Sequence, residues 1–391
     1  TVVVQHLPGK VCRAALVQQQ DQFPAQQRGE LPCRKMLPGL GFQRVNGLLH
    51  APSLAEVPRQ TQPLPRDPQG FFRLRGLVHR HTGPGRFSLS GQEADIACAV
   101  LHHDQHFNGR VAVAHSGTGI DIGAGAFIAL AVAFFTTKFS DEQLKKIDRM
   151  TTIPVVVLVA GFICAFFHLA SPMHAFGVFA GLGASPLSNE LLAGVVFAVL
   201  AIVYWIVALA GKLGEGARKG FAAVVAVMAV VFACFTGAAY MMETIASWNT
   251  PMVPVAVLGF SLLGGVSLGV LVLALSGALE DAAKGGFKMA APVVLIVGLV
   301  LGVAGLLVQV MSVSGMGNAL VDGADLVAAA SAPMWIGVVC MVVAAAAAFM
   351  ALRNTKSTAL AAAAPVLAVV GVFAARLAFY AVQLSVGLYI G

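Results

Sequence analysis

Long apolar stretches alternate with short polar segments from about residue 119 to the end of the chain. A transmembrane helix needs about 20 consecutive, largely apolar residues. Eight stretches approach or exceed that length, at about 119–135, 151–170, 191–210, 221–242, 255–275, 291–313, 334–352 and 362–388. The pattern therefore predicts an all-α, polytopic membrane protein with eight transmembrane helices. The first stretch is short and has Asp121 near its start, and the eighth is long enough to tilt or to continue along the membrane interface.

The first 120 residues have a different character. Prolines recur at positions 52, 58, 63, 65 and 68, where they break helices and strand ladders. Neither a helical nor a strand period persists for more than a few residues. We therefore expect residues 1–120 to be a non-globular segment, to which no function is assigned, before a membrane domain at 121–391. Two interpretations stay open: translation outside the true reading frame, favoured by a start without Met and an abrupt change from Arg to Lys usage, and a genuine disordered leader.

Composition narrows the class of protein. The 391 residues are 58% hydrophobic and 11% charged, whereas a soluble domain has about 45–50% apolar and about 25% charged residues. These values exclude a cytosolic enzyme, a disordered protein and a disulfide-stapled secreted domain. Most of the net charge of +7 belongs to residues 1–120. A basic segment can attract nucleic acid, but nothing else in the segment supports such binding, and we expect no nucleic-acid partner.

The loops between the apolar stretches alternate in charge. The first, third, fifth and seventh loops carry eleven Lys and Arg residues, and the second, fourth and sixth carry none. The eleven are Lys138, Lys145, Lys146, Arg149, Lys212, Arg218, Lys219, Lys284, Lys288, Arg353 and Lys356. Under the positive-inside rule, the basic loops face the cytoplasm. The pattern predicts that both ends of the eight-helix unit lie outside.

Three ionisable residues stand out, because charged groups within a membrane are costly and usually functional. His168 lies near the outer end of the second predicted helix, Glu190 at the outer start of the third, and Arg376 near the middle of the eighth. His168 and Glu190 flank the same loop and should meet at one surface. A histidine and a carboxylate could together accept the two protons released when a quinol is oxidised.

Each of these residues also has a structural interpretation. His168 could be a hydrogen-bonded interfacial histidine. Glu190 could be a first-turn helix acid that follows Ser188 or Asn189 as the N-cap. Arg376 could form a structural ion pair or clamp backbone carbonyls.

Redox metal sites are not expected in this chain. Haem ligation by two histidines requires residues that face each other from helices, and after residue 120 only His168 and His174 are present. His102, His103 and His106 lack a framework of further metal ligands. No cysteine cluster for an iron–sulfur centre and no phosphate-binding motif is present. Electrons handled by this chain would pass through a small molecule bound at its edge.

Small residues and tryptophans predict how the helices pack and where they end. Gly265 with Gly269, and Gly298 with Gly302, have the spacing that lets transmembrane helices approach closely. Trp248 and Trp335 lie at predicted outer boundaries, where aromatic residues anchor helices in the interface.

Two neighbouring motifs carry a family resemblance. Residues 168–176 read His-Leu-Ala-Ser-Pro-Met-His-Ala-Phe, and residues 183–190 read Gly-Ala-Ser-Pro-Leu-Ser-Asn-Glu. They resemble the membrane-anchor subunit of dimethyl sulfoxide reductases, the DmsC family, in which a His-Leu-Gly-Ser-Pro turn leads into a Leu-Ser-Asn-Glu or Leu-Ser-Arg-Glu helix start. Residues 248–251, 375–380 and 385–388 add support, so that the resemblance covers about 122–391. Ala170 stands where the family has glycine.

The resemblance implies a role in anaerobic electron transport. The anchor holds a molybdopterin catalytic subunit and an iron–sulfur subunit at the bacterial cytoplasmic (inner) membrane and oxidises menaquinol for them. It is a non-catalytic subunit of an oxidoreductase complex and has neither haem nor iron–sulfur cluster of its own. The quinol-site histidine of the family corresponds to His168 and its functional glutamate to Glu190. Arg376 would stabilise helix packing or an anionic intermediate at the quinol.

Two other functions are consistent with eight helices. A secondary transporter of a small solute would show inverted repeats and polar groups at the membrane midplane. No convincing repeat is found, and only Arg376 is predicted near the midplane. A purely structural anchor would bind the partner subunits without binding quinol.

Overall fold

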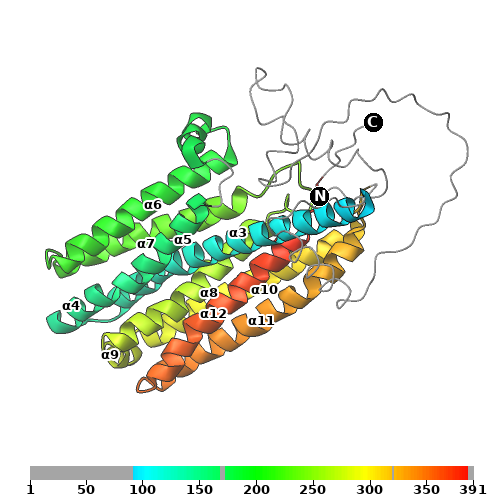
Figure 1. The fold of residues 1–391 in the computed structure, drawn as a ribbon. Coiled ribbons are helices and arrows are strands. Elements are labelled where there is room, and N and C mark those ends of the chain that lie inside the picture. The colour runs from blue at the N-terminus through cyan, green and yellow to red at the C-terminus, as the bar shows by residue number, and fades with distance from the viewer. Residues whose placement is uncertain (1–90, 168–171, 319–320, 386–391) are drawn as a thin grey trace, which may run out of the picture. The chain divides into compact units, whose positions relative to one another are not determined.

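The computed structural model describes residues 91–167, 172–318 and 321–385. Within these ranges the regular secondary structure is helical, and two isolated β-bridges lie in the loops. The α-helices are α3 (Gly91–Thr136), α4 (Asp141–Met150), α5 (Thr152–Phe167), α6 (Pro186–Leu209), α7 (Glu215–Ala238), α8 (Met252–Leu275), α9 (Leu279–Lys284), α10 (Phe287–Ser312), α11 (Gly323–Arg353) and α12 (Thr358–Ala381). Two 3₁₀ helices, η3 (Pro172–Gly181) and η4 (Val313–Gly315), lie between them. The long helices run side by side in Figure 1.

Eight spans in the described residues are long and apolar enough to cross a membrane. The first is the Val113–Thr136 part of α3, and α4 with α5 forms the second. This confirms the predicted all-α fold with eight transmembrane helices. The packing described below lies within one compact unit, Asn108–Gly391.

Three predicted helix ends were wrong. The helix α3 is already continuous from Gly91, so Asp121 lies well inside it rather than at its start. The helix α11 begins at Gly323 instead of 334, because Asp322 caps it by accepting a hydrogen bond from the Ala324 N–H at 2.9 Å. The helix α12 ends at Ala381 instead of 388.

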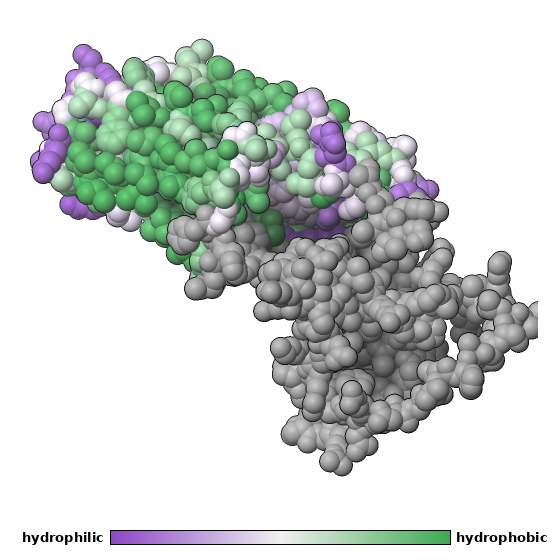
Figure 2. Space-filling model, turned by 90° about the horizontal axis from the view of Figure 1, so that it is seen from above, coloured by the Kyte–Doolittle hydropathy of each residue, from purple (hydrophilic) through white to green (hydrophobic). Residues whose placement is uncertain are grey.

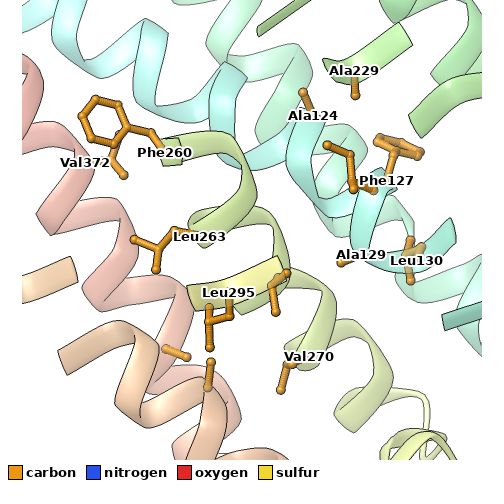
Figure 3. Packing of buried hydrophobic residues seen from close by; sticks show 14 of the residues in the cluster. Ala124, Phe127, Ala129, Leu130, Ala229, Phe260, Leu263, Val270, Leu295 and Val372 are labelled. Carbon is orange, nitrogen blue, oxygen red and sulfur yellow. The ribbon is translucent and has the colours of Figure 1, made fainter. Parts of the chain in front are cut away.

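Helices α3 and α8 form the centre of the bundle. In each of these two helices, 78% of the most apolar 18-residue segment is buried within the protein. In the other six spans the buried share is 28–44%. The helix α8 packs against α7, α10 and α12. Figure 3 shows Phe127 and Leu130 of α3 in the same core as Phe260 and Leu263 of α8 and Leu295 of α10.

Glycines let the central helices approach closely. A Cβ on Gly125 of α3 or Gly265 of α8 would overlap the backbone of the other helix, and a Cβ on Gly259 of α8 would overlap Gly302 of α10. Lipid is as apolar as leucine, so packing between membrane helices depends on such close van der Waals contact. The predicted packing role of the small residues is confirmed.

The face of the bundle seen in Figure 2 is largely apolar, with polar residues toward its two ends. Side chains on the outside of the bundle are exposed although they are aliphatic, among them Val156, Val199, Val227, Val300 and Val366. Such a surface is suited to contact with lipid chains. The chain is thus a multi-pass membrane protein.

The two ends of the bundle differ in charge. At one end, here called the Glu190 end, α5, α7, α10 and α12 finish and α6, α8 and α11 begin. The opposite end, the basic end, carries the exposed Lys and Arg residues of the odd loops. Arg218 of α7 differs from the other ten predicted loop cations in being buried: it is 5% exposed and is paired with Asp148 of α4.

Candidate functional site

Glu190 is placed by the start of α6. The helix begins at Pro186, a residue favoured at the first helical position. The N-cap is Ser185, whose side chain accepts the Ser188 N–H at 3.5 Å. Glu190 therefore lies in the second turn, and the interpretation of it as a first-turn acid was wrong.

Ser188 and Asn189, the two predicted N-caps, have other roles. The Ser188 hydroxyl donates a hydrogen bond to the Val178 carbonyl oxygen at 2.6 Å. The Asn189 side-chain oxygen accepts the Gly183 N–H at 2.8 Å. These bonds tie η3 and the turn that follows it to the start of α6, where Glu190 lies.

His168 lies outside the described residues. It follows α5, which ends at Phe167 at the same end of the bundle as the start of α6. Its approach to Glu190 stays a prediction.

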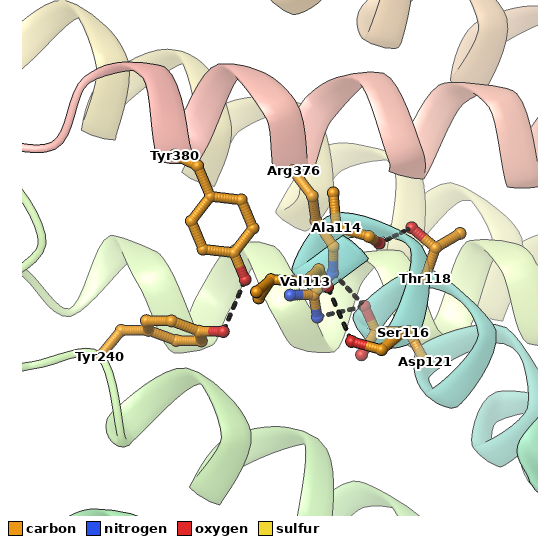
Figure 4. Close-up of polar contacts among 8 residues, drawn as sticks. All are labelled: Val113, Ala114, Ser116, Thr118, Asp121, Tyr240, Arg376 and Tyr380. Atoms are coloured by element: carbon orange, nitrogen blue, oxygen red, sulfur yellow. Dashed lines mark hydrogen bonds and ion pairs between the residues drawn. The ribbon is translucent and has the colours of Figure 1, made fainter. Parts of the chain in front are cut away.

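Arg376 forms a buried ion pair with Asp121. Its Nε and Nη2 atoms donate to Asp121 Oδ2 at 3.0 and 2.6 Å, joining α12 to α3. The two side chains are 3% and 2% exposed (Figure 4). Of the two structural interpretations, the ion pair is the one confirmed. Arg376 lies five residues before the end of α12, not near the helix middle as predicted.

Gly117 makes room for this ion pair. A Cβ at Gly117 would lie 2.6 Å from Cζ and from Nη1 of Arg376. The guanidinium therefore lies directly against the α3 backbone, one turn before Asp121.

A Gly117→Ala variant is expected to lose about 1–3 kcal/mol of bundle stability, because the guanidinium must leave its pairing geometry. Thermal unfolding in detergent measures the loss. The control is Gly220→Ala, since a Cβ at Gly220 would meet nothing within 4 Å. Equal melting temperatures for the two variants would contradict the prediction.

Glu190 joins the ion pair in one electrostatic cluster. Its charge interacts with those of Arg376 and Asp121, and Thr236 of α7 lies beside it. The Thr236 hydroxyl is buried and makes no hydrogen bond of normal geometry within the described part of the chain. Four helices, α3, α6, α7 and α12, thus converge on two carboxyl groups and one guanidinium.

Asp121 is a site residue that sequence reasoning missed. The signal was available: Asp121 is an acid in an apolar stretch, and Arg376 is a base in another. Opposite charges inside a membrane pair with each other. The apparent start of the first helix at 119 concealed that Asp121 was buried.

Two tyrosines extend the cluster toward the loop 239–251. The hydroxyl groups of Tyr240 and Tyr380 are 2.6 Å apart. Tyr380 follows Arg376 by one turn of α12, as Figure 4 shows. Neither tyrosine was a candidate from the sequence.

Trp248 fixes the same loop to α12. Its ring stacks on Phe379, with centroids 4.9 Å apart, and its Nε1 donates to the Phe379 carbonyl oxygen at 3.1 Å. Trp248 is therefore buried and not an interfacial anchor as predicted. Trp335 is 54% exposed but lies twelve residues inside α11, because that helix begins earlier than expected.

A small cavity borders the cluster. It has a volume of about 20 Å³, and its polar lining residues are Tyr240, Gln309 and Arg376. Gln309 also donates from Nε2 to the Ser247 carbonyl oxygen at 3.0 Å. A cavity of this size holds about one water molecule, so a quinol ring would need a displacement of the surrounding side chains or a place outside the cavity.

A family model described as the DMSO reductase anchor subunit (DmsC) matches residues 120–382. The chain belongs to the DmsC family. The match includes all the residues of the cluster, from Asp121 to Tyr380. Membership of the DmsC family favours an anchor subunit over the secondary transporter considered from the sequence.

Individual relatives agree with this assignment. The protein is 32% identical over 155 residues to the C subunit of anaerobic dimethyl sulfoxide reductase from Escherichia coli K12, covering 39% of this chain and 54% of the relative. It is 30% identical over 149 residues to the anaerobic dimethyl sulfoxide reductase subunit YnfH of the same strain, covering 38% and 52%. For the C subunit of the Haemophilus influenzae Rd reductase the identity is 27% over 149 residues, covering 38% and 53%. The chain thus spans about half the length of the curated relatives it matches.

Proposed function

We propose that this DmsC-family chain is the quinol-oxidising membrane anchor of an anaerobic respiratory reductase. Menaquinol binds at the Glu190 end, and its electrons pass to an iron–sulfur partner subunit that supplies a molybdopterin catalytic subunit. The observation that carries the proposal is the buried ion pair of Arg376 and Asp121, with the half-buried Glu190 close enough to interact with both charges, at one end of the bundle. Ionisable groups at such depth are retained for function.

The roles follow from the chemistry of quinol oxidation. A quinol that loses two electrons also releases two protons. His168 accepts one of them and the Glu190 carboxylate accepts the other. Arg376 is held by Asp121 and supplies positive charge beside the site, which favours an anionic quinol intermediate.

The charge of the loops supports an orientation for the site. Exposed Lys and Arg residues gather at the basic end, and the loops of the Glu190 end have none within 172–185, 239–251 and 316–318. By the positive-inside rule, the Glu190 end faces outward from the cytoplasmic membrane. The iron–sulfur subunit docks on the same face as the quinol site.

Substitution of the proton acceptors tests the proposal in the assembled complex. Glu190→Gln and His168→Gln are each expected to slow oxidation of a reduced naphthoquinone by about 100-fold, since a general base contributes that much or more. Reduction driven by a viologen dye, which donates directly to the partner subunits, should be unchanged. This second rate shows that the complex is intact.

Glu280→Gln is the matched control. Glu280 is exposed at the basic end, where the Lys284 ammonium 2.7 Å away holds the pKa of that carboxyl below its usual range. The control should oxidise quinol at the wild-type rate. A His168→Gln complex that assembles and oxidises quinol at the wild-type rate would leave only a structural anchor.

A further inference from the structure

We propose that the outer seam between α6 and α7 binds one phospholipid that has an anionic headgroup. One acyl chain lies in an apolar groove between these two helices, and the headgroup lies against Lys212 in the hairpin that joins them. The site is separate from the Glu190 cluster, and the inference does not depend on the oxidation of quinol.

The groove is open to the outside of the bundle and has an aliphatic lining. Its volume is about 330 Å³, and its lining residues are Leu200 of α6 and Ala223, Val224, Val227 and Met228 of α7. Val224 and Val227 are 52% and 64% exposed, so the groove faces the lipid. Clefts that hold small ligands have volumes of about 300–1,000 Å³. A lining without polar side chains suits a hydrocarbon chain.

Two glycines extend the groove along α7 toward the basic end. Gly216, Gly220, Ala223 and Val227 follow one another at intervals of four, three and four residues, which places them on one face of the helix. In the described part of the chain, a Cβ at Gly216 or Gly220 would meet no packed neighbour within 4 Å. This face of α7 is therefore uncovered at both glycines.

The extended groove, which consists of the two glycines and the five lining residues, has the length of one acyl chain. Gly216 and Met228 are twelve residues apart, which is about 18 Å along the helix axis at about 1.5 Å per residue. Half of the hydrocarbon core of a bilayer is about 15 Å thick. A chain that enters at the basic end would thus reach the centre of the membrane.

The charge of the α6–α7 hairpin complements an anionic headgroup. Lys212 is exposed and lies four residues before Gly216, where the extended groove begins. Glu215, the acid of this hairpin, has its carboxylate 2.7 Å from the Lys219 ammonium, so its negative charge is balanced. Basic residues between transmembrane helices at the cytoplasmic surface attract anionic lipid headgroups. Lys212 therefore stands where the headgroup of a lipid in the groove would lie.

The same features favour a phospholipid over the isoprenoid tail of a quinol as the occupant. A quinol with its ring at Glu190 would approach the groove from the opposite end, and Leu200 lies ten residues from Glu190, about 15 Å along α6. One turn beyond Val227, the same face of α7 carries Val231. The glycines thus extend the groove toward the basic end and not toward Glu190.

Native mass spectrometry of the full chain tests the site with two lipids. Dioleoylphosphatidylglycerol is the anionic probe, and dioleoylphosphatidylcholine is the neutral one. The wild type is expected to bind one phosphatidylglycerol molecule more tightly than any further one. Lys212→Gln should weaken this binding about fivefold, the effect of one Lys at an anionic lipid surface, and should leave phosphatidylcholine binding unchanged. Ala223→Phe places a ring in the groove and should weaken the binding of both lipids, because their acyl chains lose the same place.

The hairpin between α11 and α12 provides matched controls at the same end of the bundle. Lys356 is exposed in this hairpin, as Lys212 is in the other. Ala346 is exposed seven residues before the end of α11, and Ala223 lies eight residues after the start of α7. Lys356→Gln and Ala346→Phe should both bind phosphatidylglycerol as the wild type does.

Three results would overturn the proposal. Equal losses in Lys212→Gln and Lys356→Gln would show a general attraction of anionic lipid to the basic end. Unchanged phosphatidylglycerol binding in Ala223→Phe, or in Val227→Phe if Ala223→Phe does not fold, would show that the groove holds no acyl chain. Unchanged lipid binding together with a raised KM for a long-tailed menaquinol, but not for a tail-less naphthoquinol, in the assembled Ala223→Phe complex would assign the groove to the quinol tail.

Discussion

An Asp121→Asn variant is expected to destabilise the membrane bundle by about 3–5 kcal/mol, the loss typical when one partner of a buried ion pair is removed. Arg376 is 3% exposed, so its charge is cut off from bulk water when its partner becomes neutral. The loss follows from an uncompensated guanidinium between α3 and α12. Thermal unfolding of the purified protein in detergent measures it.

A double variant separates the ion pair from the packing around it. Asp121→Asn combined with Arg376→Gln leaves two neutral amides, which hydrogen-bond each other, and should recover much of the stability. Asp325→Asn is the control, because Asp325 is an exposed first-turn residue of α11 and should cost less than about 1 kcal/mol. An Asp121→Asn variant as stable as wild type would show that Arg376 has another partner.

The number and order of the helices could be predicted, because bilayer thickness fixes the length of each apolar stretch. The positions of the helix ends were harder to predict from the sequence. The segment 323–333 contains Asp325, Ser331 and Pro333 among alanines. Its low hydropathy hides the start of α11, although alanine favours the helix and Asp322 caps it.

The site was predictable only where single residues were conspicuous. Glu190 and Arg376 are rare charged residues in apolar sequence, so each could be identified as a candidate without knowledge of its partner. The pairing of Tyr240 with Tyr380 joins positions 140 residues apart, and that of Arg376 with Asp121 joins positions 255 apart. Such pairings depend on how the helices are arranged in space, and no local pattern in one sequence encodes this arrangement.

Charge alone was also misleading at the basic end. Arg218 was counted among the loop charges, yet it is buried in α7. Its Nη1 and Nη2 atoms donate hydrogen bonds to the two carboxylate oxygens of Asp148. It also lies over the Phe134 ring, 5.6 Å from the centroid. A basic residue near a helix end can therefore join helices as well as mark the cytoplasmic side.

The crossing of α3 and α8 is expected to be as sensitive as the ion pair. Gly125→Ala should cost about 3 kcal/mol or more, the upper part of the range for overpacking. The new Cβ would overlap the Ser261 carbonyl group and lie 2.9 Å from Gly265 Cα. Because these are backbone atoms of the central helix, no side chain can turn aside to relieve the overlap, and the two helices must separate.

Gly220→Ala provides the comparison for this substitution. Both glycines lie inside helices, but a Cβ at Gly220 meets open space. Alanine is the better helix former by about 1 kcal/mol, so Gly220→Ala should be neutral or stabilising. The melting temperatures in detergent should therefore move in opposite directions or diverge widely. A Gly125→Ala variant as stable as Gly220→Ala would mean that α3 and α8 do not approach at Gly125 and Gly265, and the central packing of the bundle would be wrong.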